Sequence, residues 1–330
     1  MKPNDFSGSR VLVTGGAGFI GSALVWGLNR RGCEDIVVCD LLGTSEKWRN
    51  LTPLRFEDYV EADGLLYRLQ AGALGKFDLV LHMGACSATT ETDADYLYRN
   101  NYEYTRLLAT WCLEKGVRFI YASSAATYGG GEHGFADLES GLDRLKPLNM
   151  YGYSKHLFDL WAQDQGVASR MVGFKFFNVF GPNEAHKNDM RSLVDKAVLQ
   201  IQATGKLQLF RSHKEGIADG EQTRDFVYVK DVVAIVLKAL NSKDVGGLYN
   251  LGSGQARSWN QLASAVFESM GKPKNIEYID MPAALQGKYQ YHTEAPMAKL
   301  RSALGLLPLR SLDDAVSDYV KEHLLRDQRW

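Results

Sequence analysis

Short apolar runs alternate with amphipathic segments along the first half of the 330-residue chain. The continuous apolar runs predict buried strands, at residues 11–13, 36–38, 79–82, 119–122 and 172–176. Elsewhere apolar residues return every three or four positions, which predicts helices, most clearly at residues 93–115, 150–165 and 193–204. Strands that alternate with helices in this way predict the α/β class, with a Rossmann-type, doubly wound parallel sheet.

After about residue 178 the pattern becomes irregular. Short strands are predicted among loops and helices, at residues 207–210, 226–228, 248–250 and 276–279. We therefore expect residues 1–178 to form a dinucleotide-binding domain, to which a later segment of about 225–250 returns. Residues 179–330 are expected to form mainly a smaller mixed α/β substrate-binding lobe. Ligands of such sheets bind at the carboxyl ends of the strands, so we expect a cleft there.

A glycine-rich turn joins the first predicted strand to the first predicted helix, with the sequence Val-Thr-Gly-Gly-Ala-Gly-Phe-Ile-Gly. Gly15 and Gly16 permit a tight turn, Gly18 lets the backbone approach a pyrophosphate, and Gly21 lets the helix pack closely. The phosphates would lie on the positive N-terminal end of that helix. Asp40 follows the second strand, where such folds carry an acid that binds a ribose. The pattern predicts a dinucleotide site.

Composition narrows the class of ligand. The formal net charge is −1, so the chain shows no electrostatic signature of nucleic-acid or membrane binding, and a small-molecule substrate is expected. The four cysteines have no C-x-x-C spacing and are predicted to be buried free thiols, namely Cys33, Cys39, Cys86 and Cys112. The seven histidines show no metal-binding pattern; we expect no catalytic metal.

Residues 11–29 carry no charge, a feature that targeting segments also have. Five glycines interrupt this stretch and no small-residue cleavage site follows it, so the sequence does not fit a signal peptide or a membrane span. A cytoplasmic protein is expected.

Tyr151 and Lys155 lie four residues apart at the start of a predicted helix, and therefore on one face. A neighbouring ammonium stabilises a phenolate, and we expect Lys155 to lower the pKa of Tyr151 by about 3 pH units, worth about 4 kcal/mol. Taken alone, this spacing fits a surface Tyr/Lys pair on an amphipathic helix better. Ser124 changes that balance, because it follows a predicted strand and would bring a hydroxyl to the same site.

These motifs together resemble the extended short-chain dehydrogenase/reductase family over nearly the whole chain. The resemblance implies that Ser124 hydrogen-bonds the reacting oxygen, that Tyr151 transfers its proton, and that Lys155 holds the nicotinamide ribose. It implies one tightly bound nicotinamide cofactor per subunit. The implied cofactor contacts are Gly15, Gly18, Phe19, Ile20, Gly21, Asp40, Leu41, Lys47, Met83, Gly84, Ala85, Cys86, Ser87, Asn100, Lys155 and Val179.

The choice between the two nicotinamide cofactors depends on a few residues. Asp40 would repel the 2′-phosphate of NADP, which favours NAD. In the resembling family a lysine that matches Lys47 offsets the acid, Arg49 lies nearby, and a second expected lysine is here Ala62. The expectation is NADP, with NAD as the alternative.

Residues near the catalytic motifs indicate a branch of the family. Ala125 and Ala126 stand where sugar-nucleotide dehydratases carry an acidic pair. The segment Glu-Ala-His-Lys that ends at Lys187 resembles the branch whose members epimerise an ADP-heptose at C6, for lipopolysaccharide core synthesis. The resemblance implies an isomerase that oxidises C6 to a ketone and reduces it on the other face, with Tyr151 and Lys187 as the two bases. Alternatives are a UDP-hexose 4-epimerase-like or reductase activity, or a non-catalytic dinucleotide sensor. Without the resemblance, Lys187 fits a phosphate contact or an exposed lysine better than a base.

Substrate contacts are implied by the same resemblance, at Asn178, Lys187, Asp189, Lys196, Phe210, Arg211, Ser212, His213, Arg224 and Tyr289. The chain departs from that branch at Asp189, Lys196 and residues 211–222. Arg224 would bind the diphosphate or form an ion pair with a neighbour such as Asp225, and Tyr289 would contact the sugar or be a buried aromatic. The expected partners are an ADP-sugar and further copies of the chain, in a homo-oligomer that is a pentamer if the resemblance holds.

Overall fold

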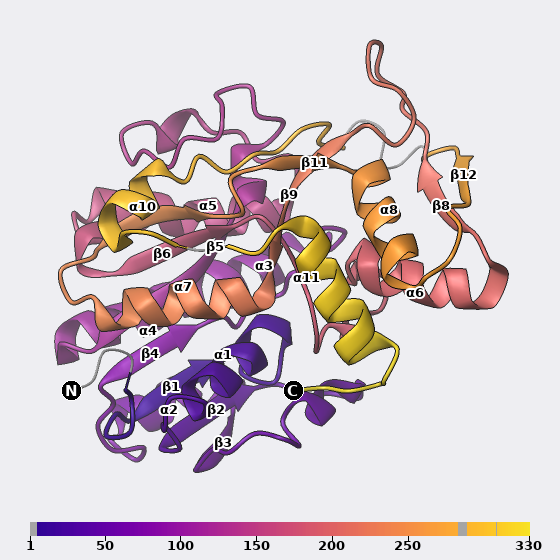
Figure 1. Ribbon diagram of the computed structural model, residues 1–330. Coiled ribbons are helices and arrows are strands. Elements are labelled where there is room, and N and C mark those ends of the chain that lie inside the picture. The colour runs from indigo at the N-terminus through magenta and orange to yellow at the C-terminus, as the bar shows by residue number, and fades with distance from the viewer. Residues whose placement is uncertain (1–4, 283–288, 308) are drawn as a thin grey trace.

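A seven-stranded sheet forms the centre of the molecule (Figure 1). The computed structural model describes residues 5–282, 289–307 and 309–330. All strands of the sheet are parallel, in the order β10-β6-β5-β4-β1-β2-β3. They are β1 (Val11–Thr14), β2 (Ile36–Asp40), β3 (Asp58–Glu61), β4 (Leu79–His82), β5 (Arg118–Ser124), β6 (Val172–Phe176) and β10 (Gly247–Leu251). The predicted α/β, doubly wound fold is confirmed.

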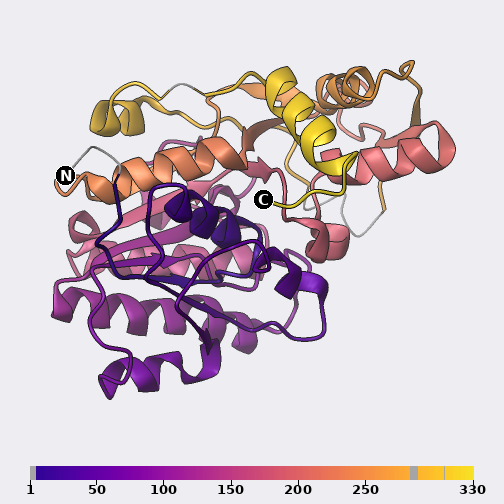
Figure 2. The same cartoon turned by 60° about the horizontal axis from the view of Figure 1, so that its bottom comes forward.

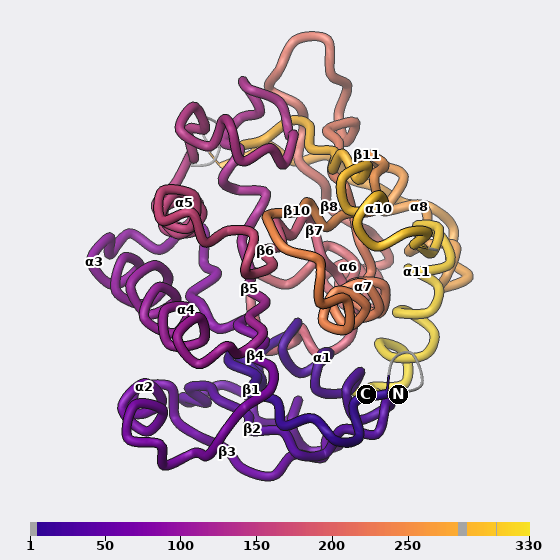
Figure 3. Tube along the Cα trace, turned by 90° about the vertical axis from the view of Figure 1, so that its left-hand side faces the viewer, coloured from indigo at the N-terminus to yellow at the C-terminus, as the bar shows by residue number. Residues whose placement is uncertain are grey.

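Helices cover both faces of this sheet, as Figure 3 shows. One face carries α1 (Phe19–Asn29) and α7 (Val229–Asn241); the other carries α2 (Ala62–Gln70), α4 (Tyr104–Lys115) and α5 (Met150–Asp164). Val11 and Val13 of β1 belong to the first core, whereas Leu12 between them belongs to the second. The apolar run of β1 is explained by this burial on both sides.

The predicted helix at residues 93–115 consists of three consecutive helical pieces. They are α3 (Ala94–Leu97), the π-helical segment η2 (Tyr98–Glu103) and α4. Asp93 caps the first piece, because its carboxylate accepts a hydrogen bond from the backbone N–H of Tyr96 at 2.8 Å. The π-helical turn shifts the helix register in front of α4.

The remaining elements form a smaller region beside the sheet, visible in Figures 1 and 2. Two small sheets belong to it, β11-β9-β7 and β12-β8. Its elements are β7 (Asn178–Phe180), η6 (Ala185–Met190), α6 (Leu193–Thr204), β8 (Leu207–Phe210), β9 (Thr223–Tyr228), β11 (Ala256–Ser258), α8 (Trp259–Ser269), β12 (Ile276–Ile279), α11 (Leu312–Asp318) and η7 (Tyr319–Leu324). Connecting elements elsewhere are η1 (Glu46–Asn50), η3 (Ala125–Tyr128), η4 (Leu142–Arg144), η5 (Ala168–Arg170) and α10 (Ala298–Leu304).

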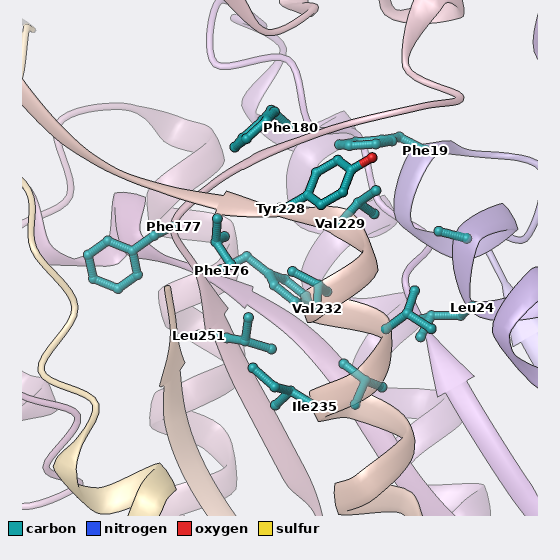
Figure 4. Packing of buried hydrophobic residues seen from close by; sticks show 14 of the residues in the cluster. Phe19, Leu24, Phe176, Phe177, Phe180, Tyr228, Val229, Val232, Ile235 and Leu251 are labelled. Atoms are coloured by element: carbon teal, nitrogen blue, oxygen red, sulfur yellow. The ribbon is translucent and has the colours of Figure 1, made fainter. Parts of the chain in front are cut away.

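A continuous apolar core joins the sheet to this smaller region (Figure 4). Phe180 of β7 and Tyr228 of β9 pack with ring centroids 5.4 Å apart. Phe19, Leu24 and Val232 extend the same cluster to α1 and α7. The two regions therefore share one hydrophobic core. Among the described residues no helix has both the length and the apolar character needed to cross a bilayer.

Candidate active site

One cavity of about 1210 Å³ lies at the carboxyl ends of the central strands and extends into the smaller region. All four predicted catalytic residues line it: Ser124, Tyr151, Lys155 and Lys187. It is also lined by the predicted cofactor residues Gly15, Gly18, Phe19, Ile20, Gly21, Asp40, Lys47, Met83, Gly84, Ala85, Cys86, Ser87 and Val179, and by Asn178, Lys196, Phe210 and Tyr289 of the predicted substrate set. The cavity therefore joins the dinucleotide motif to the catalytic motif.

The glycine-rich turn is shaped for close backbone contact. Gly15 has a φ of +64°, and a Cβ there would lie 2.6 Å from the backbone nitrogen of Gly84. A Cβ on Gly21 would lie 2.0 Å from the Gly15 carbonyl oxygen, so this glycine lets α1 pack against the turn itself. Gly18 is the N-cap of α1 and no side chain caps that helix. Its first N–H groups thus face the cavity, an arrangement that fits a pyrophosphate.

Asp40 is already engaged by its own chain. Its Oδ2 accepts the Ala17 N–H at 2.9 Å, and its Oδ1 accepts the Leu41 N–H and the Lys47 ammonium, both at 2.7 Å. Arg49, the second candidate cation, pairs with Glu46 instead. Among the described residues, Lys47 is therefore the cation that pairs with the acid at the ribose end of the dinucleotide site.

The catalytic helix α5 begins beside the serine-bearing strand. Asn149 caps it by accepting the Gly152 N–H at 2.8 Å, and Gly152 is needed because a Cβ would lie 2.7 Å from the Ala126 carbonyl oxygen. The Lys155 ammonium donates to the Ala122 carbonyl at 3.0 Å. Burial lowers the pKa of Lys155 to about 8, although the negative charge of Asp159 acts in the opposite direction.

The expected lowering of the Tyr151 pKa is not what the structure shows. Burial raises the pKa of Tyr151, and a hydrogen bond with the Ser124 hydroxyl opposes this change. Desolvation disfavours the phenolate more than the chain's own groups stabilise it. The sequence prediction considered the charge of Lys155 but could not include burial.

Lys187 lies in a short 3-10 segment, η6, between two residues with left-handed backbones. Asn183 has a φ of 75° and Asn188 a φ of 49°. The Lys187 ammonium lies 5.4 Å from the ring centroid of Phe19, at the start of α1. Burial lowers the pKa of Lys187, while the nearby Glu184 carboxylate raises it. The segment thus holds a partly desolvated amine against the dinucleotide motif.

Arg224 is buried without a carboxylate partner in the described part of the chain. Its guanidinium lies 4.8 Å from the ring centroid of Tyr289 and 5.8 Å from that of Trp259, and both of these residues line the cavity. Asp225 instead accepts three backbone N–H groups, those of Ser253, Gly254 and Ala295. The alternative of an Arg224–Asp225 ion pair is therefore wrong.

Two adjacent asparagines, Asn100 and Asn101, have different roles beside the segment that follows β4. Asn101 is fully buried; its side chain bonds the backbone N–H and C=O of Cys86 and the hydroxyl of Ser154. Asn100 donates to Asn101 at 2.9 Å and stays a predicted cofactor contact. Sequence reasoning missed Asn101, and the resemblance alone gave no signal to separate the two.

Other predicted residues lie away from the cavity wall. Asp189 is exposed, and its carbonyl accepts the Lys196 ammonium at 3.0 Å. Arg211 pairs with Asp219 and Asp280. Leu41, Asn100, Ser212, His213 and Arg224 also lie outside the lining, so their roles stay predictions.

Several lining residues, among them His186, are not among the contacts predicted from the sequence. His186 lies next to Lys187, and burial and the Lys47 and Lys187 ammonium groups lower its pKa to about 4. Cys86 is only half-buried, which corrects the expectation that all four thiols are buried. The described residues contain no group of three metal-ligating side chains.

Comparisons with known proteins agree with this geometry. The pattern of the NAD dependent epimerase/dehydratase family matches residues 11–252. The chain belongs to this family. It is 55% identical over 314 residues to the ADP-L-glycero-D-manno-heptose-6-epimerase of Nitratidesulfovibrio vulgaris, which covers 95% of this chain and 97% of the relative. The enzyme of the same name from Fusobacterium nucleatum is 46% identical, covering 97% and 99%.

A solved structure is also similar. The Helicobacter pylori ADP-L-glycero-D-manno-heptose-6-epimerase superposes with a TM-score of 0.81 at 30% identity, covering 96% of both chains. Members of the NAD dependent epimerase/dehydratase family use a nicotinamide cofactor, and the uncapped start of α1, the turn at Gly15 and Lys155 fit one.

Proposed function

We propose that the chain is an isomerase that interconverts ADP-D-glycero-D-manno-heptose and ADP-L-glycero-D-manno-heptose, for lipopolysaccharide core synthesis. Relatives that carry the name of this epimerase match it at 55% and 46% identity over nearly its full length. The observation that carries the mechanism is that Tyr151 and Lys187, from different regions of the fold, line the same cavity.

The chemistry of C6 explains two proton-transferring groups. C6 has no adjacent carbonyl to acidify its C–H bond, so inversion needs a transient ketone. When bound, the nicotinamide cofactor would accept the C6 hydride and return it to the opposite face. Oxidation releases one hydroxyl proton and reduction takes one up, and the two epimers present that hydroxyl differently.

Burial shifts the pKa values of the two groups in opposite directions. Burial raises the pKa of Tyr151, which favours the phenol that donates a proton. Burial lowers the pKa of Lys187, which favours the neutral amine that accepts one. Ser124, in contact with Tyr151, would hold the reacting oxygen. We assign the hydroxyl proton of one epimer to Lys187 and that of the other to Tyr151.

The diphosphate of the substrate would lie against Arg224. A buried guanidinium without a carboxylate partner in the described chain favours an anionic ligand, and phosphate can bind its fork in a bidentate manner. In this proposal residues 1–178, with the returning segment 225–250, hold the cofactor. The remainder of residues 179–330 mainly holds the sugar nucleotide.

The proposed cofactor is NADP. The Asp40 carboxylate is neutralised by Lys47 and accepts N–H groups of its own chain, so it is less able to bind a free 2′-hydroxyl. Chromatography of the nucleotide released from the purified protein is expected to give NADP, and a Lys47→Ala variant is expected to shift the mixture toward NAD. Release of NAD alone from the unmodified protein would contradict this choice.

The decisive experiment supplies each ADP-heptose epimer and a panel of UDP-sugars without added reductant. Proton NMR is expected to show either ADP-heptose moving to the same mixture of epimers, with no net gain of reduced nicotinamide. Turnover of UDP-hexoses alone would favour the 4-epimerase alternative, and no turnover despite bound cofactor would favour a sensor.

The formation of a homo-oligomer remains a prediction, which sedimentation analysis would test.

A further inference from the structure

A buried ion pair lies directly behind the catalytic helix. Lys175 of β6 and Asp159 of α5 are both fully enclosed, with Nζ and Oδ2 2.8 Å apart. Lys175 also donates to the Thr127 hydroxyl at 2.6 Å and lies 4.9 Å from the Tyr128 ring centroid. A buried ion pair contributes little net stability, because both charges lose their hydration. We therefore expect the Lys175–Asp159 pair to have a role other than stability.

Asp159 connects this pair to the strand that ends in the catalytic serine. Its Oδ2 accepts the Ser123 hydroxyl at 2.7 Å and its Oδ1 accepts the Tyr121 hydroxyl at 3.2 Å. Ser123 is also the register partner of Lys175 in the neighbouring strand. The carboxylate thus ties α5 to both β5 and β6, immediately before Ser124.

The same carboxylate lies one helical turn beyond Lys155. Tyr151, Lys155 and Asp159 are spaced by four residues along α5, which places them on one face of the helix. Lys155 donates to the Ala122 carbonyl, on the strand that Asp159 holds through residues 121 and 123. Asp159 therefore helps to place the Ala122 carbonyl that accepts the Lys155 ammonium, and its carboxylate supplies a negative charge near that ammonium.

We propose that Asp159, paired with Lys175, is a positioning residue that keeps the Lys155 ammonium charged and fixed between Tyr151 and the end of β5. The inference rests on the proposed function in giving Lys155 a role in the reaction. Without Asp159, α5 and β5 would each keep their backbone bonds but lose the bonds from Tyr121 and Ser123 to Asp159 that join them.

The charges around Lys155 agree with this role. Burial lowers the pKa of Lys155 to about 8, and the first group that opposes this effect is Asp159, followed by Cys86. His82 of β4 also faces Lys155, but burial lowers its pKa to about 3 and it stays neutral. Tyr151 on the same helix is held as the phenol, because burial raises its pKa. Asp159 therefore supplies most of the nearby negative charge.

The test measures Lys155 directly. In the full-length protein, trace acetylation followed by mass spectrometry gives the pH midpoint of Lys155 reactivity. In Asp159→Asn we expect this midpoint to fall by about one pH unit, the lower end of the effect of a nearby opposite charge. The alkaline limb of the epimerisation rate is expected to move to lower pH by the same amount.

Further variants separate positioning from folding. Asp159→Asn leaves Lys175 buried and unpaired, so Asp159→Asn/Lys175→Met removes both charges and is expected to fold while keeping the lowered midpoint. Asp159→Glu keeps the charge and is expected to restore the midpoint. Asp231→Asn removes another buried helical carboxylate, paired with Arg310, and is expected to lose stability without a change at Lys155.

An unchanged Lys155 midpoint in the double variant would overturn the proposal. So would an equal fall in Asp231→Asn, because the effect would then be general destabilisation. The labelling needs no substrate, so failure of the protein to convert ADP-heptoses would refute the proposed function and leave this test intact.

Discussion

The two sides of the cavity are built in different ways. On one side Tyr151 and Lys155 lie on a regular helix, α5, which is capped by Asn149 and bonded to the central sheet through Lys155 and Asp159. On the other side Lys187 lies in a 3-10 segment between two left-handed asparagines. Arg224, on this second side, is buried against aromatic rings with no carboxylate partner in the described chain.

We interpret the first side of the cavity as preorganised for proton transfer and the second side as the part that binds the substrate. The first side holds two paired charges within the protein, Lys175 with Asp159 and Lys47 with Asp40. On the second side the Arg224 guanidinium is buried without a carboxylate partner in the described chain, which destabilises the free protein and favours an anionic ligand. We therefore expect changes on the first side to alter proton transfer and changes on the second to alter binding as well.

The largest expected effect comes from removing either proton-transferring group. Tyr151→Phe and Lys187→Met are each expected to slow epimerisation by about 10²- to 10⁴-fold, the usual contribution of a positioned acid or base. Stopped-flow absorbance of reduced nicotinamide, started with each epimer separately, should show that one variant fails to oxidise one epimer and the other variant its partner.

Two outcomes would contradict the proposed difference between the two sides of the cavity. If both variants lose oxidation of the same epimer, the two sides do not serve opposite faces. If Lys187→Met is fully active, the second side supplies no base. Lys238→Met, on α7 and outside the cavity lining, is the control and should match the unmodified protein.

The next effect separates binding from stability. Arg224→Gln is expected to weaken ADP binding by about 10- to 100-fold, because a charge-assisted hydrogen bond is worth about 1.5–3 kcal/mol. Thermal unfolding of the free protein is expected to stay unchanged or rise, since a buried unpaired charge is removed. Calorimetric titration with ADP provides the affinity.

A matched arginine makes this result interpretable. Arg257 of β11 is the register partner of Arg224, and neither residue lines the cavity itself. The Arg224 guanidinium lies against the lining residues Tyr289 and Trp259, whereas the Arg257 guanidinium bonds Gln255. Arg257→Gln is expected to change ADP affinity by less than about 2-fold, in line with substitutions away from a site. Equal losses in both variants would indicate a general electrostatic effect rather than a diphosphate contact.

The first side of the cavity, formed by α5 and the central sheet and called the regular side below, is also the part that could be predicted from the sequence. The five predicted strands lie in the central sheet because apolar runs mark strands buried on both faces. Strand β3 was missed, since it is an edge strand in which only Val60 is buried. The glycine turn, Ser124, Tyr151 and Lys155 could be located because each occupies a fixed place relative to a strand or helix.

What could not be predicted depends on burial and on register. The Lys175–Asp159 pair forms only because β6 lies beside β5 with Lys175 opposite Ser123. Burial determines the direction in which the pKa of Tyr151 shifts, and it is a property of the assembled cavity. The isolation of Arg224 likewise depends on Asp225 finding backbone partners elsewhere.

Acid is expected to weaken the regular side through His82. Its ring is buried between the Thr14 and Thr105 hydroxyls, and burial lowers its pKa to about 3. The unfolded chain binds a proton near pH 6.5, so stability falls as the pH drops from there toward 3. This group alone should cost about 2 kcal/mol between pH 8 and pH 5.

Denaturant unfolding across that range measures the effect. His82→Gln is expected to be less stable at pH 8 but to lose less stability on acidification than the unmodified protein. Parallel curves for the two proteins would mean that other groups, such as His186 on the second side, account for the acid sensitivity.

The smallest expected effect concerns the backbone that holds Lys187. Asn188 has a φ of 49° and a ψ of −121°, a conformation that glycine adopts more readily than alanine. Asn188→Ala should therefore lower the free energy of unfolding by about 1 kcal/mol, while Asn188→Gly should not. If this conformation positions Lys187, Asn188→Ala also lowers kcat several-fold.

A glycine on the regular side provides the comparison for this last change. Gly116 ends α4 with a φ of 68° and open space around it, so Gly116→Ala introduces similar strain far from the cavity. It should cost a similar free energy of unfolding but leave kcat unchanged. If Asn188→Ala loses stability yet keeps full kcat, the left-handed backbone is only a feature of the loop, and Lys187 finds its position through its contacts with Phe19 and Glu184 instead.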